Sequence, residues 1–582
     1  MKERRPVAVV TGGGGGIGAA IAEELGRDGW FVVTADPLVS LDGSERLAEP
    51  EETTAGRIVA AGGAARASSV SVTDGESVRS LFQELVGEHG GLDAVVNVAG
   101  ITRQNGFAHG TEKDWLDLLT VHLGGYLNVL NAALPIMAPA GHGHILGVTS
   151  GSGWRAADAG GYSCAKRVVA SLTWQLGTQL PAGVTVNAMS PIAATRMVAA
   201  ALERARKAGG ERGGGGLSLS SMAGPEYLGP LGAHFVSDEF GWCNGQVLFA
   251  GGSEEAVIDE PRLLEVVRSD DVVSLAHVLE AVIPRAFAIA EASQATDGAS
   301  NPRFGSIFDE PAPAEPASAS VQSCLVAVDS PNLAACLTAT LEARSVICHR
   351  VDVAHGFGDA ADALGALVAS AGPIDAVVVA PAGRELRKGR IDGWERLLAE
   401  HEGIIEDIHT DAAWARAVAD YAAASGRPVR LVTITDATTS GGRSRGQAAA
   451  QLARAAAGST QGRVGAFAVS VETPEEQGAR PAAELVAYLI GQSEATSVAG
   501  SELAIGAGWV GLRSHPRPVG SVTYGGPSVP SWLDRTLREI VGANVCPAEA
   551  STTETSPTEA RATEARATEA RATESRATEV DA

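Results

Sequence analysis

Residues 7–18 read VAVVTGGGGGIG, and we infer the fold of the first part of the chain from this stretch. A short apolar run ends in five glycines, and apolar residues then recur at helical spacing at Ile17, Ile21 and Leu25. This is the layout of a strand, a tight turn and a helix, in which glycine lets the backbone approach a pyrophosphate without a colliding Cβ. A helix that begins near Gly16 would direct its free amides and positive dipole end at the phosphates. The stretch therefore predicts a dinucleotide site.

An acidic residue follows the second apolar run, at the distance that a ribose-binding carboxylate has from such a glycine turn. The run at residues 30–35 ends at Asp36, about 20 residues after the glycines, where a carboxylate would accept hydrogen bonds from ribose hydroxyls. A carboxylate repels a 2′-phosphate, and no Arg or Lys lies between Thr11 and Gly26, so we expect NAD in preference to NADP. The alternative is that Asp36 only opens a turn at Pro37.

Two later apolar runs also end in polar or glycine-containing motifs. Residues 92–96 lead into Asn-Val-Ala-Gly at residues 97–100, and residues 145–148 lead into Ser-Gly-Ser-Gly at residues 150–153. Each run has the length and apolar character of a strand that is buried on both faces. These motifs would therefore lie at the carboxyl ends of strands, which is the edge where ligands bind in open α/β sheets.

Tyr162 and Lys166 are four residues apart, so on a helix both side chains lie on one face and the ammonium can approach the phenol. A phenol with a pKa of about 10 is a poor base at neutral pH, and an adjacent cation would stabilise the phenolate and lower that pKa. Such a pair is commonly only a solvated helix face. Because Ser150 lies upstream and a nucleotide motif precedes all three residues, we interpret them as a catalytic group.

With these motifs, residues 1–252 resemble the short-chain dehydrogenase/reductase family. The family's Thr-Gly-x-x-x-Gly-x-Gly matches residues 11–18, its Asn-Asn-Ala-Gly matches residues 97–100, and its Ser, Tyr and Lys match the candidate catalytic group. The resemblance implies a Rossmann-type α/β fold with a doubly wound parallel sheet. The cofactor-binding residues that it implies are Gly12, Gly14, Gly16, Ile17, Gly18, Asp36, Val72, Asn97, Ala99, Gly100, Tyr162, Lys166, Pro191, Ile192 and Thr195.

Two features depart from the family pattern. His122 stands where many members carry an Asn whose backbone holds a water of the proton relay, and a backbone role survives this change, so His122 joins the candidate catalytic residues. The interval from Ser150 to Tyr162 is one residue shorter than is common in the family, which makes Ser152 a lesser candidate for the serine. The sequence around these residues is most similar to the 3-hydroxyacyl-CoA and hydroxysteroid dehydrogenase and 3-oxoacyl reductase branches.

The resemblance implies an NAD-dependent oxidoreductase that interconverts a secondary alcohol and a ketone, such as a hydroxyacyl or steroid-like compound. Tyr162 would exchange the hydroxyl proton, Ser150 would hydrogen-bond the oxygen, and Lys166 would bind ribose and lower the pKa of Tyr162. One alternative is a nucleotide-binding sensor or scaffold whose second half recruits a partner, although a sensor gives Tyr162 and Lys166 no task. Another is a family member that catalyses dehydration or epimerisation.

The composition argues against several classes of partner. A net charge of −24 over 582 residues disfavours nucleic acid and anionic membranes. No apolar run approaches the ~18–20 residues that cross a bilayer, and the start of the chain leads directly into an expected strand, without room for a signal peptide. Six cysteines without a pairing pattern fit a reduced cytoplasm. The histidines are scattered along the sequence, so we expect no catalytic metal.

The rest of the chain predicts a second, truncated copy of the same fold. Residues 373–378 (PIDAVV) resemble residues 91–96 (GLDAVV), and residues 500–508 resemble the closing strand at residues 245–252. Several such matches in the same order indicate an internal duplication. The expected domains are a catalytic NAD-binding domain at residues 1–260, a helical extension and Pro/Ala-rich linker at 261–320, a degenerate copy at 321–515, and a C-terminal segment with a disordered repeat tail at 516–582.

The second copy lacks the residues that would do chemistry. Gln447 and Gln451 stand where the first copy has Tyr162 and Lys166, and the glycine motif is missing. Because Gln has neither the acid chemistry of Tyr nor the charge of Lys, this copy would run no reaction and bind no dinucleotide. We expect it instead to take the place of a partner subunit in an intramolecular pseudo-dimer that buttresses the helix of Tyr162, and two chains to form a homodimer.

Three further segments have recognisable patterns. Residues 196–224 include a glycine run at 213–216 and are expected to form a lid over the substrate, although an idle glycine loop is the alternative. Residues 263–292 have apolar positions at helical spacing and predict one or two helices. Residues 309–320, with three prolines, predict a linker.

Overall fold

The computed structural model describes residues 4–156, 158–200, 222–269, 272–294, 321–383 and 393–542. The glycine run at residues 213–216, the linker at residues 309–320 and the repeat tail at its Arg-Ala-Thr-Glu units lie outside these described residues. No helix among the described residues is both long enough and apolar enough to span a bilayer.

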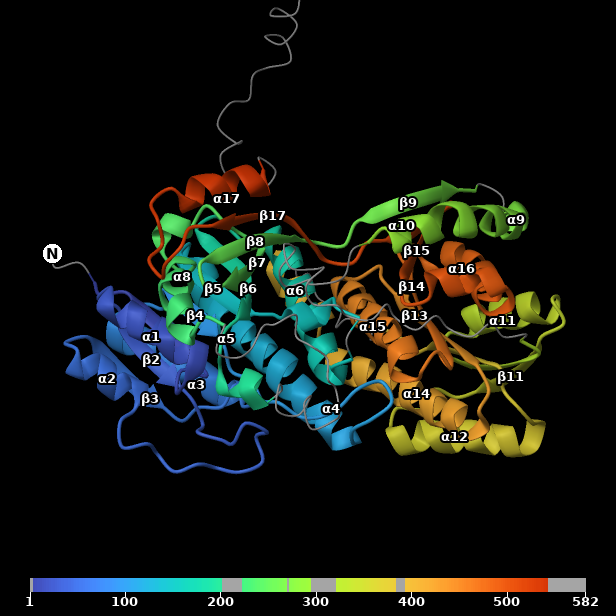
Figure 1. The fold of residues 1–582 in the computed structure, drawn as a ribbon, viewed down its shortest axis with the longest axis horizontal. Helices are drawn as coiled ribbons and strands as arrows, with labels where there is room; N and C mark the ends of the chain where they lie inside the picture. Colours follow the sequence, from blue (N-terminus) through green and yellow to red (C-terminus); the bar gives the residue numbers. More distant parts are fainter. Residues whose placement is uncertain are drawn as a thin grey trace, which may run out of the picture. The chain divides into compact units, whose positions relative to one another are not determined.

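The first sheet has the strand order β17-β8-β7-β6-β5-β4-β1-β2-β3 (Figure 1). Strands β3 to β7 pair in parallel, and β8 and β17 are antiparallel additions at one edge. Every residue of β1, β4 and β5 is buried, which explains their continuous apolar runs. The strands are β1 (Val7–Thr11), β2 (Phe31–Ala35), β3 (Ala64–Ser68), β4 (Ala94–Asn97), β5 (Gly143–Val148), β6 (Val184–Ile192), β7 (Val247–Gly251), β8 (Glu254–Asp259) and β17 (Arg517–Thr523).

The helices between these strands follow the alternation of a doubly wound sheet, so the expected fold class is confirmed. Short helical turns interrupt the longer helices, and one of them, η1, has π-helical geometry. The α-helices are α1 (Gly16–Arg27), α2 (Thr54–Ala60), α3 (Gly75–His89), α4 (Glu112–Leu119), α5 (Gly125–Ala140), α6 (Gly160–Gly177) and α8 (Gly229–His234), and the short turns are η1 (Thr120–Gly124), η2 (Gly151–Gly153), η4 (Pro225–Leu228) and η5 (Asp238–Phe240).

The second sheet has the strand order β11-β10-β12-β13-β14-β15-β16-β9. Its strands are β10 (Ser323–Val328), β11 (Ile347–Val351), β12 (Ala376–Ala380), β13 (Val429–Asp436), β14 (Val464–Val471), β15 (Glu502–Gly506), β16 (Trp509–Arg513) and β9 (Leu263–Arg268). Its helices include α9 (Val272–Val282), α10 (Ala288–Ala292), α11 (Pro331–Glu342), α12 (Phe357–Ala371), α13 (Gly393–Glu400), α14 (Ile404–Ser425), α15 (Ser440–Ser459) and α16 (Glu475–Gly491).

The two sheets match strand for strand when β10 is set on β1 and β11 on β2. Strands β12 to β16 then correspond to β4 to β8, and among the described residues β3 has no counterpart in the second sheet. The second α/β sheet that the sequence predicts is therefore present and shorter by one strand. An origin of this sheet by duplication stays a prediction.

The two sheets exchange their last strands. β9 follows β8 in the chain but pairs antiparallel with β16 of the second sheet, and β17 follows β16 but pairs antiparallel with β8 of the first. In Figure 1 β9 accordingly lies beside the helices of the second sheet, and β17 beside β8. The hairpin of β7 and β8 is thus extended by β17, which comes from the second half of the chain. The hairpin of β15 and β16 is extended by β9, which comes from the first half.

This exchange corrects one expectation of local structure. Residues 263–268 form β9, although their apolar spacing predicted a helix, and only the segment from residue 272 is helical. The physical reason is tertiary: β16 offers an unpaired row of amides and carbonyls, and pairing with it outweighs a weak local preference for helix.

Helix α6 of the first half packs against helix α15 of the second half. We call the contact between these two helices the seam. Cys164 and Val168 on α6 belong to the same apolar cluster as Ala448 and Leu452 on α15. Figure 1 shows the two helices side by side, with α4 and α14 meeting along the same seam. One apolar core therefore runs through both halves of the unit that ends at Ile540.

Candidate active site

The glycine turn leaves the start of α1 open. Gly12 and Gly16 have φ angles of +65° and +55°, in the left-handed region that favours glycine. A Cβ on Gly12 would lie 2.9 Å from the backbone of Ala99, and one on Gly18 would lie 2.4 Å from the Gly12 carbonyl oxygen. The residue that caps α1 is Gly15, no side chain bonds to the amides there, and the first turn contains no acid. These amides and the helix dipole are available to an anion such as a pyrophosphate.

Asp36 lies directly against this turn. Its Oδ2 accepts a hydrogen bond from the Gly14 amide at 3.0 Å, and its Oδ1 accepts one from the Leu38 amide at 2.9 Å. The carboxylate therefore both opens the turn after β2 and faces the position expected for an adenosine ribose. Its place fits the ribose interpretation and the turn interpretation equally, because one carboxylate has lone pairs for both.

A cation that sequence spacing did not reveal also approaches the turn. The guanidinium of Arg196, which follows β6, lies 3.2 Å from the place where a Cβ of Gly15 would stand. The sequence has no Arg or Lys between Thr11 and Gly26, but in the folded chain a cation from a distant segment lies next to the glycine turn. Arg196 comes from about 180 residues away, so only the folded chain brings it to the start of α1, where phosphates are expected.

The end of β4 connects the glycine turn with His122. Asn97 accepts a hydrogen bond from the Thr11 hydroxyl at 2.8 Å, and that hydroxyl accepts one from the Ala99 amide at 3.3 Å. Gly100 lies so close to the ring of His122 that a Cβ there would be 2.5 Å from its Cε1. This tight approach explains why glycine follows Ala99, and it places the η1 helix against the end of β4.

His122 is buried and neutral. Burial lowers the pKa of this imidazole to about 3, and the nearby charge of Lys166 acts in the same direction. Its Nε2 lies 2.8 Å from the carbonyl oxygen of Ile101 and 3.3 Å from the Ile101 amide nitrogen, while the buried Nδ1 has no partner among the described residues. The ring stands edge-on to that of Tyr162 with centroids 4.9 Å apart. A π-helical turn carries His122, and such turns are frequent at functional sites.

Ser150, Tyr162 and Lys166 come together at the carboxyl end of β5. Ser150 caps η2, where its hydroxyl accepts a hydrogen bond from the Ser152 amide at 3.3 Å, and it lies near enough to the phenol of Tyr162 to influence the pKa of that phenol. The ammonium of Lys166 lies 5.7 Å from the centroid of the Tyr162 ring and donates to the carbonyl of Val148 at 2.6 Å. The helical spacing of Tyr162 and Lys166 on α6 thus places both beside the serine.

The pKa values differ from the sequence-based expectation. Burial is the largest influence on Tyr162 and raises the pKa of its phenol, although the hydrogen bond with Ser150 acts against it. Burial also lowers the pKa of Lys166 to about 7. Burial of the Tyr162 phenol therefore opposes the expected lowering of its pKa by Lys166, and that lowering stays a prediction.

The remaining cofactor candidates lie at the same edge of the first sheet. Pro191 and Ile192 end β6 and pair with the end of β7. The Thr195 methyl lies 3.8 Å from the place of a Cβ on Gly16, so Thr195 faces the glycine turn. Val72 packs against Gly125 at the start of α5, and Ile17 is half-buried in the first turn of α1. The structure thus brings the candidates to the carboxyl edge of the first sheet, and Val72 lies there after the end of β3.

Sequence reasoning missed residues that reach this site from the second half. The Gln451 side chain on α15 donates to the carbonyl oxygens of Ser152 and Arg155, at 3.2 and 2.9 Å. Arg167 on α6 donates to Gln447 at 3.0 Å and to Gln451 at 3.3 Å. Gln447 and Gln451 were identified only as replacements for catalytic residues, and no pattern in the sequence predicts their partners.

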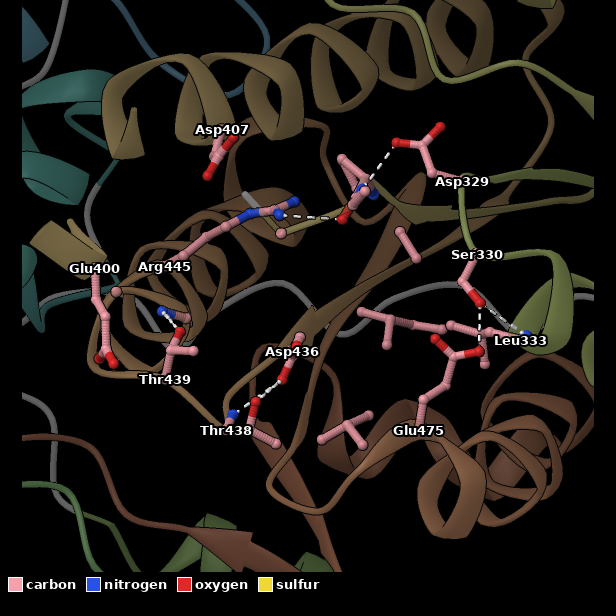
Figure 2. A pocket seen from close by; sticks show the side chains of 18 of the residues that line it. Asp329, Ser330, Leu333, Glu400, Asp407, Asp436, Thr438, Thr439, Arg445 and Glu475 are labelled. Carbon is pink, nitrogen blue, oxygen red and sulfur yellow. Dashed lines mark hydrogen bonds between the residues drawn. The ribbon is translucent and has the colours of Figure 1, made fainter. Parts of the chain in front are cut away.

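The corresponding edge of the second sheet holds a cavity of about 1150 Å³ (Figure 2). Figure 2 shows Glu475 accepting a hydrogen bond from Ser330, whose hydroxyl also accepts one from the Leu333 amide at the start of α11. Glu400 accepts a hydrogen bond from the Ser440 amide at the start of α15. Carboxylates of the chain itself therefore lie at helix starts where a phosphate would bind. The acidic residues of the lining are Asp329, Glu400, Glu402, Asp407, Asp436 and Glu475.

Comparison with known proteins agrees with this geometry. The short chain dehydrogenase family model matches residues 6–206. The short-chain reductase protein NovJ of Streptomyces niveus is 33% identical over 254 residues, which are 42% of this chain and 92% of that protein. The acetoacetyl-CoA reductase of Cupriavidus necator is 31% identical over 242 residues, or 41% of this chain and 94% of that protein.

One solved structure extends over both sheets. The N-domain of a bacterial malonyl-CoA reductase, crystallised with NADP, has a TM-score of 0.60 and covers 84% of this chain and 95% of that one. At 17% identity this likeness concerns the fold alone. The sequence matches of the first half and the cluster of Ser150, Tyr162 and Lys166 lead to one conclusion. The chain belongs to the short-chain dehydrogenase family of oxidoreductases.

Proposed function

We propose that the chain is an NAD-dependent reductase of ketones and dehydrogenase of secondary alcohols, active only in the first half. The observation that carries this proposal is the cluster of Ser150, Tyr162 and Lys166 at the same sheet edge as the open start of α1. A nicotinamide cofactor supplies or accepts the hydride when it is bound. The glycine turn, Asp36 and Lys166 are the residues that would hold it, and the turn has the room and the free amides that a pyrophosphate requires.

The protonation states support Tyr162 as the proton donor. The raised pKa of its phenol keeps the hydrogen on Tyr162 at neutral pH, so the Oη can donate it to a carbonyl oxygen as that oxygen gains negative charge. Ser150, which lies beside this phenol, would turn its single hydroxyl hydrogen to the same oxygen and donate a second hydrogen bond to it. Lys166, with a pKa of about 7, can exchange a proton near neutral pH and restore the phenol. Buried His122 stays neutral and would position the ring of Tyr162.

The names of the relatives support a class of substrate. An acetoacetyl-CoA reductase and a 3-oxoacyl-[acyl-carrier-protein] reductase of Staphylococcus aureus, the latter 34% identical over 72% of its length, each act on a keto group in an acyl thioester. We therefore propose a 3-oxoacyl or similar β-keto compound as substrate, reduced to the hydroxy compound. A hydroxysteroid or another secondary alcohol is the alternative within the same reaction class.

NAD is the proposed cofactor because Asp36 would accept hydrogen bonds from ribose hydroxyls and repel a 2′-phosphate. Arg196 does not contradict this proposal, since it lies at Gly15, near the expected pyrophosphate, rather than at Asp36. The five described cysteines are free thiols, which supports a reducing compartment such as the cytoplasm.

The test of this function is oxidation of NADH or NADPH, followed by absorbance, with a panel of ketones that includes acetoacetyl thioesters, other β-keto esters and steroid ketones. We expect turnover of at least one β-keto compound with NADH. Binding of NADH without turnover of any ketone or alcohol would contradict the proposal and favour a nucleotide sensor.

We further propose that the second half replaces a partner subunit and positions the loop of the catalytic serine. Gln451 holds both ends of the segment from Ser152 to Arg155, which begins two residues after Ser150. Residues 1–260 and 321–515 are then the catalytic and the supporting domain, joined by the exchanged strands, and this intramolecular pseudo-dimer could pair with a second chain into a homodimer.

The variants Gln451→Met and Gln451→Glu test this role. Both remove the donor to the two carbonyls, whereas only Gln451→Glu keeps an acceptor for Arg167. We expect kcat to fall about threefold to tenfold in both, with NADH affinity unchanged, because such a hydrogen bond contributes ~1 kcal/mol. The control is Gln175→Met, a glutamine of α6 that bonds Ser444 across the seam without reaching η2. Equal kcat values in all four proteins would contradict the role.

A further inference from the structure

A second polar cluster lies at the opposite edge of the first sheet, at the amino ends of β4, β5 and β6. His142 and His144 at the start of β5 meet Asp238 at the start of η5, and their potential ligand atoms all lie within 4.8 Å of one another. In the part of the chain that the structure describes, no other set of three His, Cys, Asp or Glu side chains converges in this way. We propose that these three residues bind one transition-metal ion, with Zn²⁺ as the best fit.

The distances between the ligand atoms fit tetrahedral coordination. Oδ1 of Asp238 lies 3.1 Å from Nε2 of His144 and 3.7 Å from Nδ1 of His142. Four ligands at the usual bond length of ~2.0–2.1 Å from Zn²⁺ are about 3.4 Å from each other. The two observed distances lie on either side of this value, so small rotations of the three side chains would complete the geometry.

Each histidine already uses its other ring nitrogen in the way that metal ligands do. Nδ1 of His144 lies 2.9 Å from the hydroxyl of Thr185, and Nε2 of His142 lies 3.4 Å from a carboxylate oxygen of Asp93. Partners of this kind fix the orientation of a ligating imidazole and leave its second nitrogen for the ion. His144 is also held by its backbone, which pairs with β4 on one side and β6 on the other. His144 thus stands on a rigid part of the fold, with His142 two residues before it.

The donor set indicates the class of ion. Two imidazoles and one carboxylate suit Zn²⁺, Co²⁺ or Ni²⁺, whereas Mg²⁺ and Ca²⁺ prefer oxygen ligands alone. The side chains of His142 and Asp238 are 42% and 82% exposed, so an ion can enter from solvent and water can serve as the fourth ligand. The site lies at the edge away from Tyr162, so the ion would tie η5 to β5 as a structural clip and take no part in catalysis.

The experiment is isothermal titration of ZnCl₂ into the full-length chain, prepared without an affinity tag and freed of metal with EDTA followed by dialysis. We expect saturable binding of one ion per chain and a higher melting temperature in its presence, since an ion that binds only the folded state stabilises it. Co²⁺ should give the intense visible absorption of a tetrahedral ion. Asp238→Asn, at an exposed position that does not endanger folding, should weaken Zn²⁺ binding at least tenfold, and His142→Ala should do the same.

The matched control is His277→Ala, which removes a histidine on α9 that is 92% exposed and lies 3.7 Å from a carboxylate oxygen of Glu280. This variant should bind Zn²⁺ as the wild type does. The proposal is overturned if the wild type shows no saturable binding, if Asp238→Asn binds with unchanged affinity, or if the Co²⁺ spectrum is the weak one of an octahedral ion.

Discussion

The carboxyl edges of the two sheets have the same topology and opposite chemistry. At the first, α1 begins with the uncapped Gly15 and no acid in its first turn. At the second, α11 begins with Pro331, which has no amide hydrogen, and its cap Ser330 bonds both the Leu333 amide and the carboxylate of Glu475. A phosphate that entered the second edge would meet a negative charge in the place where the first offers free amides. We therefore expect a nucleotide to bind at the first edge, where the start of α1 is left unsatisfied, and not at the second.

The helices that meet at the seam show the same contrast. α6 carries Tyr162, the proposed proton donor, and Lys166, whose pKa is lowered by burial. α15 carries Gln447 and Gln451, which are neutral and fully engaged with Arg167, Glu502 and the loop behind Ser150. We expect α6 to supply the catalytic residues, whereas α15 supplies the hydrogen bonds across the seam. We expect the difference between the two halves to appear in four measurements.

Separation of the halves is expected to have the largest effect. Residues 1–308 contain β9 without its partner β16, β8 without β17, and α6 without the apolar face of α15. We expect this fragment to be insoluble or self-associated and to lack turnover, because unpaired strand edges and exposed apolar surface favour aggregation. Size-exclusion chromatography and the NADH assay measure both properties. A soluble, monomeric, fully active fragment with the melting temperature of the whole chain would show that the second half gives no support.

Tyr162→Phe is expected to abolish turnover while NADH affinity stays within a few-fold. Loss of the proton donor should lower kcat by ~10²–10⁴-fold, the usual contribution of general acid–base catalysis. The matched control is Tyr126→Phe, which removes the hydroxyl of a tyrosine buried on α5 and should leave kcat within a few-fold. If Tyr162→Phe keeps more than about a tenth of the wild-type kcat, Tyr162 is not the general acid.

Cofactor selectivity should follow Asp36. We expect kcat/KM for NADH to exceed that for NADPH at least tenfold, a difference of ~1.4 kcal/mol, and Asp36→Ser to reduce this ratio. Arg196→Ala should weaken both cofactors to a similar extent, since its guanidinium lies at Gly15, where both would place the pyrophosphate. Initial rates over a range of each cofactor give the NADH-to-NADPH ratio of kcat/KM for each of the three proteins. A wild-type preference for NADPH, or a selective loss of NADPH in Arg196→Ala, would reverse the assignment.

Lys166→Gln gives the first half the residue that the second has at Gln451, and its effect on stability should depend on pH. The folded-state pKa of Lys166 is about 7, below its value of about 10.4 in an unfolded chain. Between these values the unfolded chain binds more protons, so the wild type gains stability relative to the variant as pH rises, by up to ~1.4 kcal/mol per pH unit. Urea unfolding of both proteins at pH 7 and pH 9 measures this change. A difference independent of pH would mean that Lys166 is not desolvated in the folded chain.

The sequence by itself determined the first sheet and the identity of the residues at its carboxyl edge. These features depend on patterns within a few residues: five glycines after an apolar run, Asp36 after the next, and Tyr162 one helical turn before Lys166. The second sheet was also predictable, since its apolar runs follow one another in the same order as those of the first sheet.

The contacts between distant segments of the chain could be identified only in the folded structure. The exchange of β9 and β17, the approach of Arg196 to Gly15, the bonds of Gln451 to the loop behind Ser150 and the meeting of His142 with Asp238 all join residues far apart in the chain. No local preference specifies such contacts, and in β9 the pairing with β16 overrode one. The pKa values of Tyr162 and Lys166 likewise could not be predicted from the sequence. Desolvation depends on every residue that packs around a group, whereas spacing along a helix indicates only its nearest neighbours.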